Sequence, residues 1–205
     1  MTRFLATVAF VALGASATAT EIPDPANSWY VIDGAAIGAS IYVVPDGSGR
    51  PLTEAYAQGG NVVDATITVY LLDIWGDPVP DYPAEDIWIA TVDGGLVACP
   101  GGATADAPTD AFGETHFQDP LEAGGWSATE AVQVFVAGLP LVGAPLELRL
   151  NSADIDGDLE VDLTDIVLFA QTLGGYDYAV DYNYDGAVDL ADIVRLVPAI
   201  GADCD

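Results

Sequence analysis

Hydrophobic and polar residues alternate in short runs over most of residues 20–150. In the clearest run the two kinds take turns along Ala65, Thr66, Ile67, Thr68, Val69, Tyr70 and Leu71. A period of two predicts a β-strand with one buried face. Similar β-rich runs occupy 87–92, 115–117, 132–136 and 146–150, and Gly, Pro and Asp turns separate them at 45–49, 93–95, 99–102 and 123–125. The pattern predicts a β-sandwich, and no stretch of this region shows a helical period.

The first 19 residues follow a different pattern. Arg3 precedes a largely apolar run over residues 4–14, and small residues follow at Ala15, Ala17 and Ala19. This layout is typical of a secretory signal peptide cleaved after Ala17 or Ala19, so we expect a signal peptide at 1–19 and a secreted protein, extracellular or at the cell surface. The alternative is an N-terminal strand or helix of the fold. No segment approaches the roughly 20 apolar residues of a membrane span, so no membrane-spanning segment is expected.

From residue 151 the chain carries a duplicated pattern. The segments 154–165 (DIDGDLEVDLTD) and 181–192 (DYNYDGAVDLAD) each place an acid or amide at positions 1, 3, 5, 9 and 12, and an apolar segment expected to be helical follows each. This is the ligand spacing of an EF-hand loop, because calcium takes six to eight oxygen ligands and positions 1, 3 and 5 of a tight loop converge on one centre.

The spacing assigns a ligand set to each loop, and we expect two calcium ions. The first set is Asp154, Asp156, Asp158 and Asp165 through side chains, Glu160 through its carbonyl, and Asp162 directly or through water. The second set is Asp181, Asn183, Asp185 and Asp192, the carbonyl of Ala187, and Asp189. The alternative is a pair of solvated acidic turns.

Three positions of the loops predict local geometry. Position 6 requires a positive φ, which suits Gly186 but strains Leu159, so Gly157 is expected to absorb part of the first turn. Both loops close with Asp, one methylene shorter than the usual Glu, and must therefore close more tightly. Position 8 is Val161 in one loop and Val188 in the other. In paired loops this residue usually lies in the short β-bridge between them.

These Asp-closed duplicated loops, with no obvious helix ahead of either, resemble a type I dockerin domain over about residues 151–202. The resemblance implies a small helical module with two calcium ions and, in cellulosomes, a cohesin partner. Dockerins commonly carry Ser-Thr and then Lys or Arg where this chain has Leu163-Thr164 and Ala170-Gln171, and again Leu190-Ala191 and Val197-Pro198. Because these replacements are largely apolar, we expect the two helices to pack on each other or on the β-domain.

The β-rich region resembles a bacterial immunoglobulin-like domain over about residues 60–150. The resemblance rests on a strand ending in Asp73, the Gly-x-Pro-Val turn at 76–79 and the Thr-Asp-x-x-Gly-x-Thr hairpin at 109–115. It implies a spacer, adhesive or structural module. The expected fold is therefore mostly β with a small α module: an immunoglobulin-like β-sandwich over 20–150, followed by a dockerin-like pair of calcium motifs over 151–205.

The charge of the chain excludes one class of partner, and its two cysteines predict a cross-link. The chain has 32 Asp and Glu against 4 basic residues, none of them lysine, for a net charge of −28. Such a chain cannot supply the clustered Lys and Arg that nucleic acid requires, so no nucleic-acid partner is expected. The two cysteines, Cys99 and Cys204, are expected to form a disulfide if the protein is exported. A metal or catalytic thiol pair and two free thiols are the alternatives.

No catalytic residue is assigned. His116 is the only histidine, expected on an exposed strand, and no Gly-x-Ser-x-Gly elbow accompanies it. Trp29, Trp75, Trp88 and Trp126 are interpreted as buried aromatics, with a sugar-stacking platform as the alternative.

We expect a calcium-binding, non-enzymatic protein that acts in structural attachment or protein–protein assembly, with a cohesin-like or other cell-surface protein as partner. The alternative is a component of a polysaccharide-binding or polysaccharide-degrading complex recruited through its dockerin. A small glycan-active hydrolase is the minority interpretation.

Overall fold

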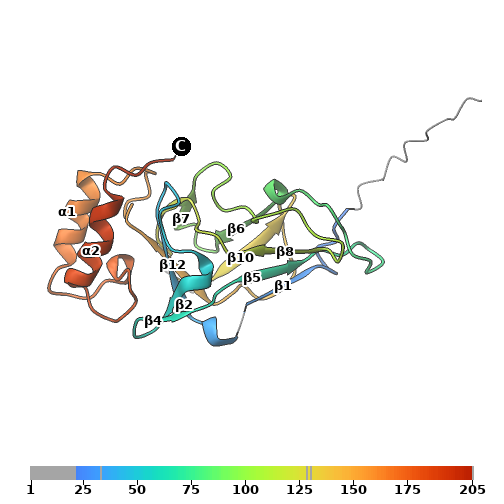
Figure 1. Cartoon of the computed structure of the whole chain (residues 1–205), viewed down its shortest axis with the longest axis horizontal. Coiled ribbons are helices and arrows are strands. Elements are labelled where there is room, and N and C mark those ends of the chain that lie inside the picture. Colours follow the sequence, from blue (N-terminus) through green and yellow to red (C-terminus); the bar gives the residue numbers. More distant parts are fainter. Residues whose placement is uncertain (1–21, 33, 128, 130, 205) are drawn as a thin grey trace, which may run out of the picture.

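The protein is mostly β, with two helices (Figure 1). The computed structural model describes residues 22–32, 34–127, 129 and 131–204, and the expected signal peptide lies outside them. The strands are β1 (Trp29–Ile32), β2 (Ala39–Val43), β3 (Ala55–Ala57), β4 (Asn61–Val63), β5 (Ile67–Tyr70), β6 (Ile87–Thr91), β7 (Leu96–Ala98), β8 (Glu114–Phe117), β9 (Ala123–Gly125), β10 (Val132–Val136), β11 (Leu139–Pro140) and β12 (Leu148–Ser152). The helices are α1 (Leu163–Thr172) and α2 (Leu190–Ala199), and 3-10 turns lie at Gly34–Ala36, Leu52–Glu54, Ala84–Asp86 and Tyr178–Val180.

Two antiparallel sheets of three strands form the body of the β-rich part. Their strand orders are β1-β5-β8 and β11-β10-β6. Ile67 and Val69 of β5 point inward, as do Val132 and Val134 of β10, and all four lie in one hydrophobic core. The strands predicted from alternation around 65–71, 87–92, 115–117 and 132–136 are confirmed. Every second residue of these strands is buried, which matches the alternation of apolar and polar residues in the sequence.

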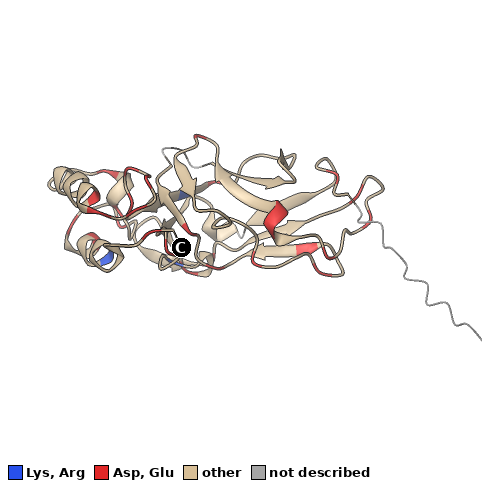
Figure 2. Cartoon of the chain, turned by 90° about the horizontal axis from the view of Figure 1, so that it is seen from above, with Lys and Arg blue, Asp and Glu red and all other residues tan. Residues whose placement is uncertain are grey.

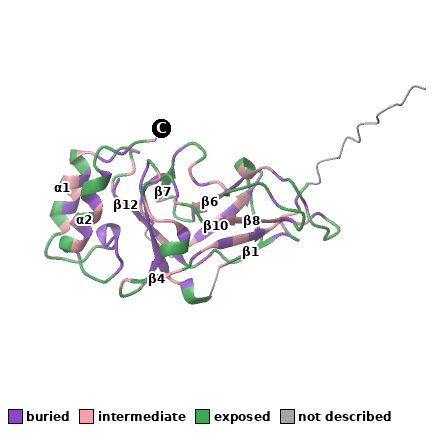
Figure 3. Cartoon of the chain, viewed as in Figure 1, coloured by how far each residue is buried: buried purple, intermediate pink, exposed green. Residues whose placement is uncertain are grey.

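A four-stranded sheet, in the order β12-β2-β3-β4, separates two hydrophobic cores. Every residue of β2 is buried (Figure 3). Ile41 and Val43 belong to the core of the β-rich part, whereas Tyr42 and the following Val44 belong to a second core shared with the helices. The parallel partner of β2 is β12, which spans the expected domain boundary after residue 150. The two parts of the chain therefore share a sheet.

The second core holds the two helices against this sheet. Phe169 of α1 and Leu196 of α2 are buried with Tyr42, Val161 and Tyr182. Figure 1 shows both helices at one end of the molecule, beyond β12 and β2. Within the described part of the chain, no helix has both the length and the apolar character needed to cross a membrane.

All three arginines of the described chain lie over tyrosine rings at this junction. The guanidinium carbon of Arg50 is 4.5 Å from the centre of the Tyr56 ring, and that of Arg195 is 5.4 Å from the same ring. Arg149 lies 4.9 Å from the centre of the Tyr178 ring. Arg195 Nη2 also donates a hydrogen bond to Tyr56 Oη at 2.9 Å, which ties α2 to β3. The few positive charges are thus concentrated between the β-rich part and the helices, while Asp and Glu are spread over the loops (Figure 2).

The C-terminal tail is fastened to both parts. Cys204 forms a disulfide with Cys99, the residue after β7. Val161 donates its N–H to the carbonyl of Ala202 and accepts from the N–H of Gly201, both at 2.8 Å. The prediction that Val161 and Val188 form the bridge between the loops is therefore wrong for Val161, whose backbone groups are taken by the tail.

The apolar outer faces of the helices differ from the expectation. Leu163, Leu190 and Val197 were expected to pack on the other helix or on the β-domain, but they are 70%, 70% and 56% exposed. The inward positions are already filled by Phe169 and Leu196, so the apolar residues beside them face outward. The prediction that the helices pack on the β-domain is confirmed, but the packing runs through Phe169 and Leu196 and not through these replacements.

Candidate metal centre

The first loop curls around the carboxylate of Asp154, directly after β12. Asp154 Oδ1 accepts hydrogen bonds from the N–H groups of Gly157 at 2.8 Å and Asp158 at 3.2 Å, and Oδ2 accepts from Leu159 at 2.8 Å. Asp154 itself is fully buried. A first-position Asp that organises the turn leaves positions 3 and 5 facing the same centre.

Three carboxylates of this loop converge. Oxygen atoms of Asp154, Asp156 and Asp158 lie within 4.8 Å of one another, and among the described residues this is the only such group of three metal-ligating side chains. Asp165, at position 12, is buried and accepts from the N–H of Ile155 at 2.7 Å through Oδ1. The carboxylate that would close the site is thereby held toward the start of the loop.

Glu160 and Asp162, the other two predicted ligands of this loop, take part in local hydrogen bonds. Glu160 forms an antiparallel β-bridge with Asp203 of the tail and donates its N–H to Asp158 Oδ1 at 3.0 Å. Asp162 caps α1, and Asp165 Oδ2 accepts from the Asp162 N–H at 2.9 Å, which completes a capping box. The start of α1 is thus fixed by two of the predicted ligands.

The second loop repeats these contacts. Asp181 accepts from the N–H groups of Asp185 at 3.2 Å and Gly186 at 3.0 Å, as Asp154 does in the first loop. Asp192 Oδ1 accepts from the N–H of Tyr182 at 2.9 Å, and its Oδ2 accepts from Asp189, the cap of α2, at 3.0 Å. The internal repeat of the sequence is therefore also a repeat of hydrogen bonds from backbone N–H groups to carboxylates.

Position 3 distinguishes the second loop, because it is an amide. Asn183 Nδ2 donates to Asp185 Oδ2 at 2.7 Å, so these two predicted ligands contact each other. Ala187, whose carbonyl is the predicted ligand at position 7, donates its N–H to Asp185 Oδ1 at 2.9 Å. The second loop therefore offers one fewer carboxylate than the first.

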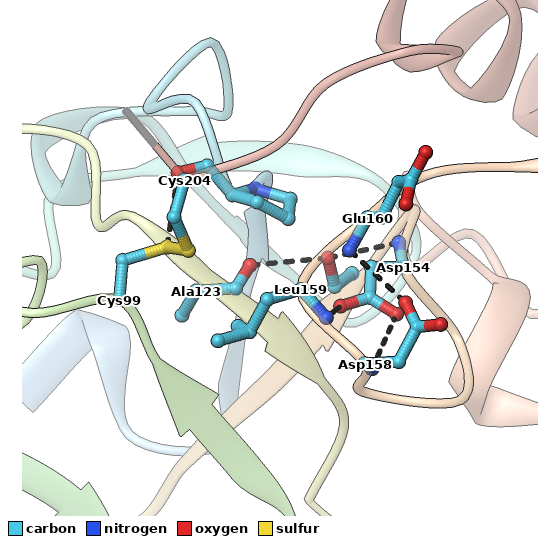
Figure 4. The surroundings of a disulfide bond; sticks show 9 residues. Cys99, Ala123, Asp154, Asp158, Leu159, Glu160 and Cys204 are labelled. Carbon is cyan, nitrogen blue, oxygen red and sulfur yellow. Dashed lines mark hydrogen bonds between the residues drawn. A yellow bond between two sulfur atoms is a disulfide. The ribbon is translucent and has the colours of Figure 1, made fainter.

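Positions 4 and 6 are left-handed in both loops. In the first loop they are Gly157, with φ 74°, and Leu159, with φ 73°; in the second they are Tyr184, with φ 54°, and Gly186, with φ 90°. Each loop thus has one glycine for two positions that favour glycine, and the strain expected at Leu159 is confirmed. Leu159 extends toward the Cys99–Cys204 disulfide (Figure 4). The disulfide is therefore an apolar neighbour for the Leu159 side chain.

The buried carboxylates are poorly compensated. Burial raises the pKa of Asp154 from its ordinary 3.8 to about 6; the charges of Asp165 and Asp158 add to the rise, and backbone N–H groups oppose it. Burial likewise raises the pKa values of Asp165, Asp181 and Asp192. Among the described residues, no arginine is a leading cause of these four shifts.

These donors fit a hard divalent cation. They are all oxygens, carboxylates predominate, and the first- and last-position acids are buried with raised pKa values. Calcium prefers oxygen ligands in a flexible cage of six to eight, and it would supply the missing positive charge. The predicted residues could therefore hold one ion in each loop.

Sequence reasoning missed two glycine pairs that lie against these loops. Gly124 and Gly125 of β9 contact the first loop, and Gly59 and Gly60, between β3 and β4, contact the second. The sequence predicted a turn at 123–125, which is wrong because these residues form β9, and Gly59–Gly60 was not singled out. Adjacent glycines can also mark a close approach of two backbone segments, and that was the available signal.

The other candidate residues lie elsewhere. His116 in β8 has both ring nitrogens 3.2 Å from neighbours, Thr68 Oγ1 and Glu114 Oε1. Trp75 is 79% exposed and Trp29 is 44% exposed, so the expectation that the tryptophans are buried is wrong for these two.

Comparison with known proteins adds little. No family model matches the sequence, and no curated protein matches it. Among solved structures, the filamin domain of Lin-41 is similar with a TM-score of 0.32 and 18% sequence identity, over 63% of this chain and 96% of that chain.

Proposed function

We propose that this is an exported protein that binds two calcium ions through a dockerin-like module and acts in attachment or protein–protein assembly outside the cell. In this proposal the β-rich part is an immunoglobulin-like sandwich that serves as a spacer or adhesive domain. The observation that carries the proposal is the repeated loop: in both copies the first- and last-position acids are buried and bonded to equivalent backbone N–H groups.

The exposed helix faces support an assembly role. Leu163 and Leu190 occupy the same position of the two repeats, as do Val167 and Val194, which are 50% and 63% exposed. Apolar side chains exposed at matching positions are a feature of surfaces that meet other proteins. A cohesin-like domain is the partner that the dockerin resemblance implies.

Calorimetric titration with calcium tests the first half of the proposal. The full chain should bind two ions, while Asp154→Asn and Asp181→Asn should each lose one. Glu147→Gln, which removes an exposed acid outside the loops, is the matched control and should retain both. Melting with EDTA and then with excess calcium should give different Tm values, because calcium binds the folded state. Identical melting curves and no heat of binding would refute the proposal.

The assembly half needs a separate test. A cohesin domain or cell-surface extract should retain the wild-type chain, and Leu163→Ser with Leu190→Ser should weaken retention while calcium binding is unchanged. If the variant with both substitutions is retained as well as the wild-type chain, the partner contacts another surface of the protein.

A carbohydrate-associated role is the second candidate, and one observation favours it. Trp29 stacks on Tyr70 with ring centres 4.0 Å apart, and Trp75 is largely exposed. Exposed aromatic faces are suitable for stacking against sugar rings. Retention on a polysaccharide that is lost in Trp75→Ala would favour this role, and binding to no glycan would exclude it.

A further inference from the structure

The two glycine pairs of the β-rich part lie against different loops of the helical part. Gly124–Gly125 lies in β9 and faces the first loop, while Gly59–Gly60 lies in the turn between β3 and β4 and faces the second. The two pairs come from distant parts of the sequence, so each loop is supported separately.

At the first loop, β9 fixes the residue at position 1. The N–H of Gly125 donates to the backbone carbonyl of Asp154 at 2.7 Å. A methyl group at Gly124 would overlap Asp154 Oδ2 and lie 2.6 Å from its Cγ, so glycine is required for the carboxylate to lie where it does. Ser152 Oγ donates a hydrogen bond to the carbonyl of Ala123 at 3.3 Å, which ties the end of β12 to the same strand.

At the second loop, the β3–β4 turn fixes the residue at position 4. The N–H groups of Gly59 and Gly60 both donate to the carbonyl of Tyr184, at 2.8 Å and 3.1 Å. A methyl group at Gly60 would lie 3.3 Å from Cβ of Asp185, and the φ of Gly60 is 80°. The contact is close but less severe than the one at Gly124.

From these contacts we propose that β9 and the β3–β4 turn position the two loops for calcium, so that ion binding and the order of the β-rich part depend on each other. The inference rests on the proposed calcium function and names Gly124, Gly125, Gly59 and Gly60 as positioning residues. A loop already held in its bound shape loses less conformational freedom when the ion binds, which strengthens binding. By reciprocity, the bound ion stabilises the glycine contacts.

Calorimetric calcium titration of full-length variants tests the positioning role. Gly124→Ala should weaken one of the two sites by roughly 10- to 100-fold, the range seen when groups that orient metal ligands are lost, and leave the other site unchanged. Gly60→Ala should weaken the other site by less. Gly34→Ala is the matched control, because a methyl group there meets nothing within 4 Å and φ is not in the left-handed range. Wild-type affinity at both sites in Gly124→Ala would overturn the inference.

A measurement on the wild-type chain covers the case in which Gly124→Ala fails to fold. Calcium should slow hydrogen exchange at the amides of Gly59, Gly60 and Gly125, because their acceptors are carbonyls of the two loops. The amide of Ile89, which donates to Ala103 within the β-rich part, is the reference for a global change in stability. Calcium binding with no selective slowing at the glycines overturns this inference alone, whereas absence of calcium binding overturns the proposed function as well.

Discussion

Breaking the Cys99–Cys204 disulfide tests how much the fold depends on a cross-link between its two parts. The bond joins residues with a sequence separation of 105. In the chain-entropy model, closing a loop of this length stabilises the folded state by about 4.7 kcal/mol, by restricting the unfolded chain. Cys99→Ala, Cys204→Ala and the double variant should therefore lose nearly the same free energy of unfolding, since each removes the same bond.

Urea unfolding followed by tryptophan fluorescence, with calorimetry in excess calcium, measures the loss. For a chain of this size, a change of 1 kcal/mol moves Tm by roughly 2 to 4 °C, so the expected decrease is roughly 10 to 20 °C. Cys204→Ala is the cleanest variant because Cys99 is 4% exposed and its truncation also removes buried contacts. Wild-type protein treated with reductant is the control and should match it. A loss below about 1 kcal/mol, or single-variant losses that add in the double variant, would refute the reasoning.

Three further predictions concern the loops and the junction. Without calcium, stability should fall as pH rises from about 4 to about 6, because the raised pKa of Asp154 makes the folded state bind a proton more tightly than the unfolded state; calcium affinity should rise over the same range. Urea unfolding in EDTA and calcium titration at several pH values check both trends, and a stability that rises with pH would contradict the first. Gly186→Ala should cost about 1 kcal/mol through backbone strain, since φ is 90° and a methyl group would meet no neighbour; an unchanged unfolding free energy would contradict this. Tyr56→Phe should cost about 1 kcal/mol by removing the acceptor of the Arg195 hydrogen bond while keeping the ring. Tyr82→Phe, away from the junction, is its control, and equal losses would argue against a special role for the junction.

Sequence reasoning succeeded where one face of an element meets water. The strand β5 was predicted because Thr68 and Tyr70 are half-exposed between buried Ile67 and Val69. It failed at β2, where both faces are buried and no alternation remains to be seen. A strand that is buried on both faces shows no alternation of apolar and polar residues in its sequence, and for that reason the shared sheet could not be predicted.

The spacing of residues within each loop predicts the hydrogen bonds inside the loop, but it does not predict the contacts with the β-rich part that hold the loop in place. Bonds from loop N–H groups to Asp154 and Asp181 follow from positions 1 to 6 of each repeat, so a short segment contains all the information. The contact of Gly124 with Asp154 joins β9 to a loop that is distant in sequence, and nothing in the spacing of the loop encodes it. Exposure of Leu163 was missed for a related reason, because apolar character favours burial without saying whether space remains inside.

The position of the disulfide also determines how the chain would carry mechanical tension. A pull applied between the N-terminal strands and residue 204 follows the covalent path to Cys99 and crosses directly to Cys204. Both candidate metal loops, both helices and the strands from β8 onward lie in the bypassed segment and bear no load along the chain. In the reduced protein the same pull could draw out a further segment spanning 105 positions, roughly 350 Å when extended. The cross-link therefore limits how far the molecule can be stretched before its candidate ion sites are disturbed.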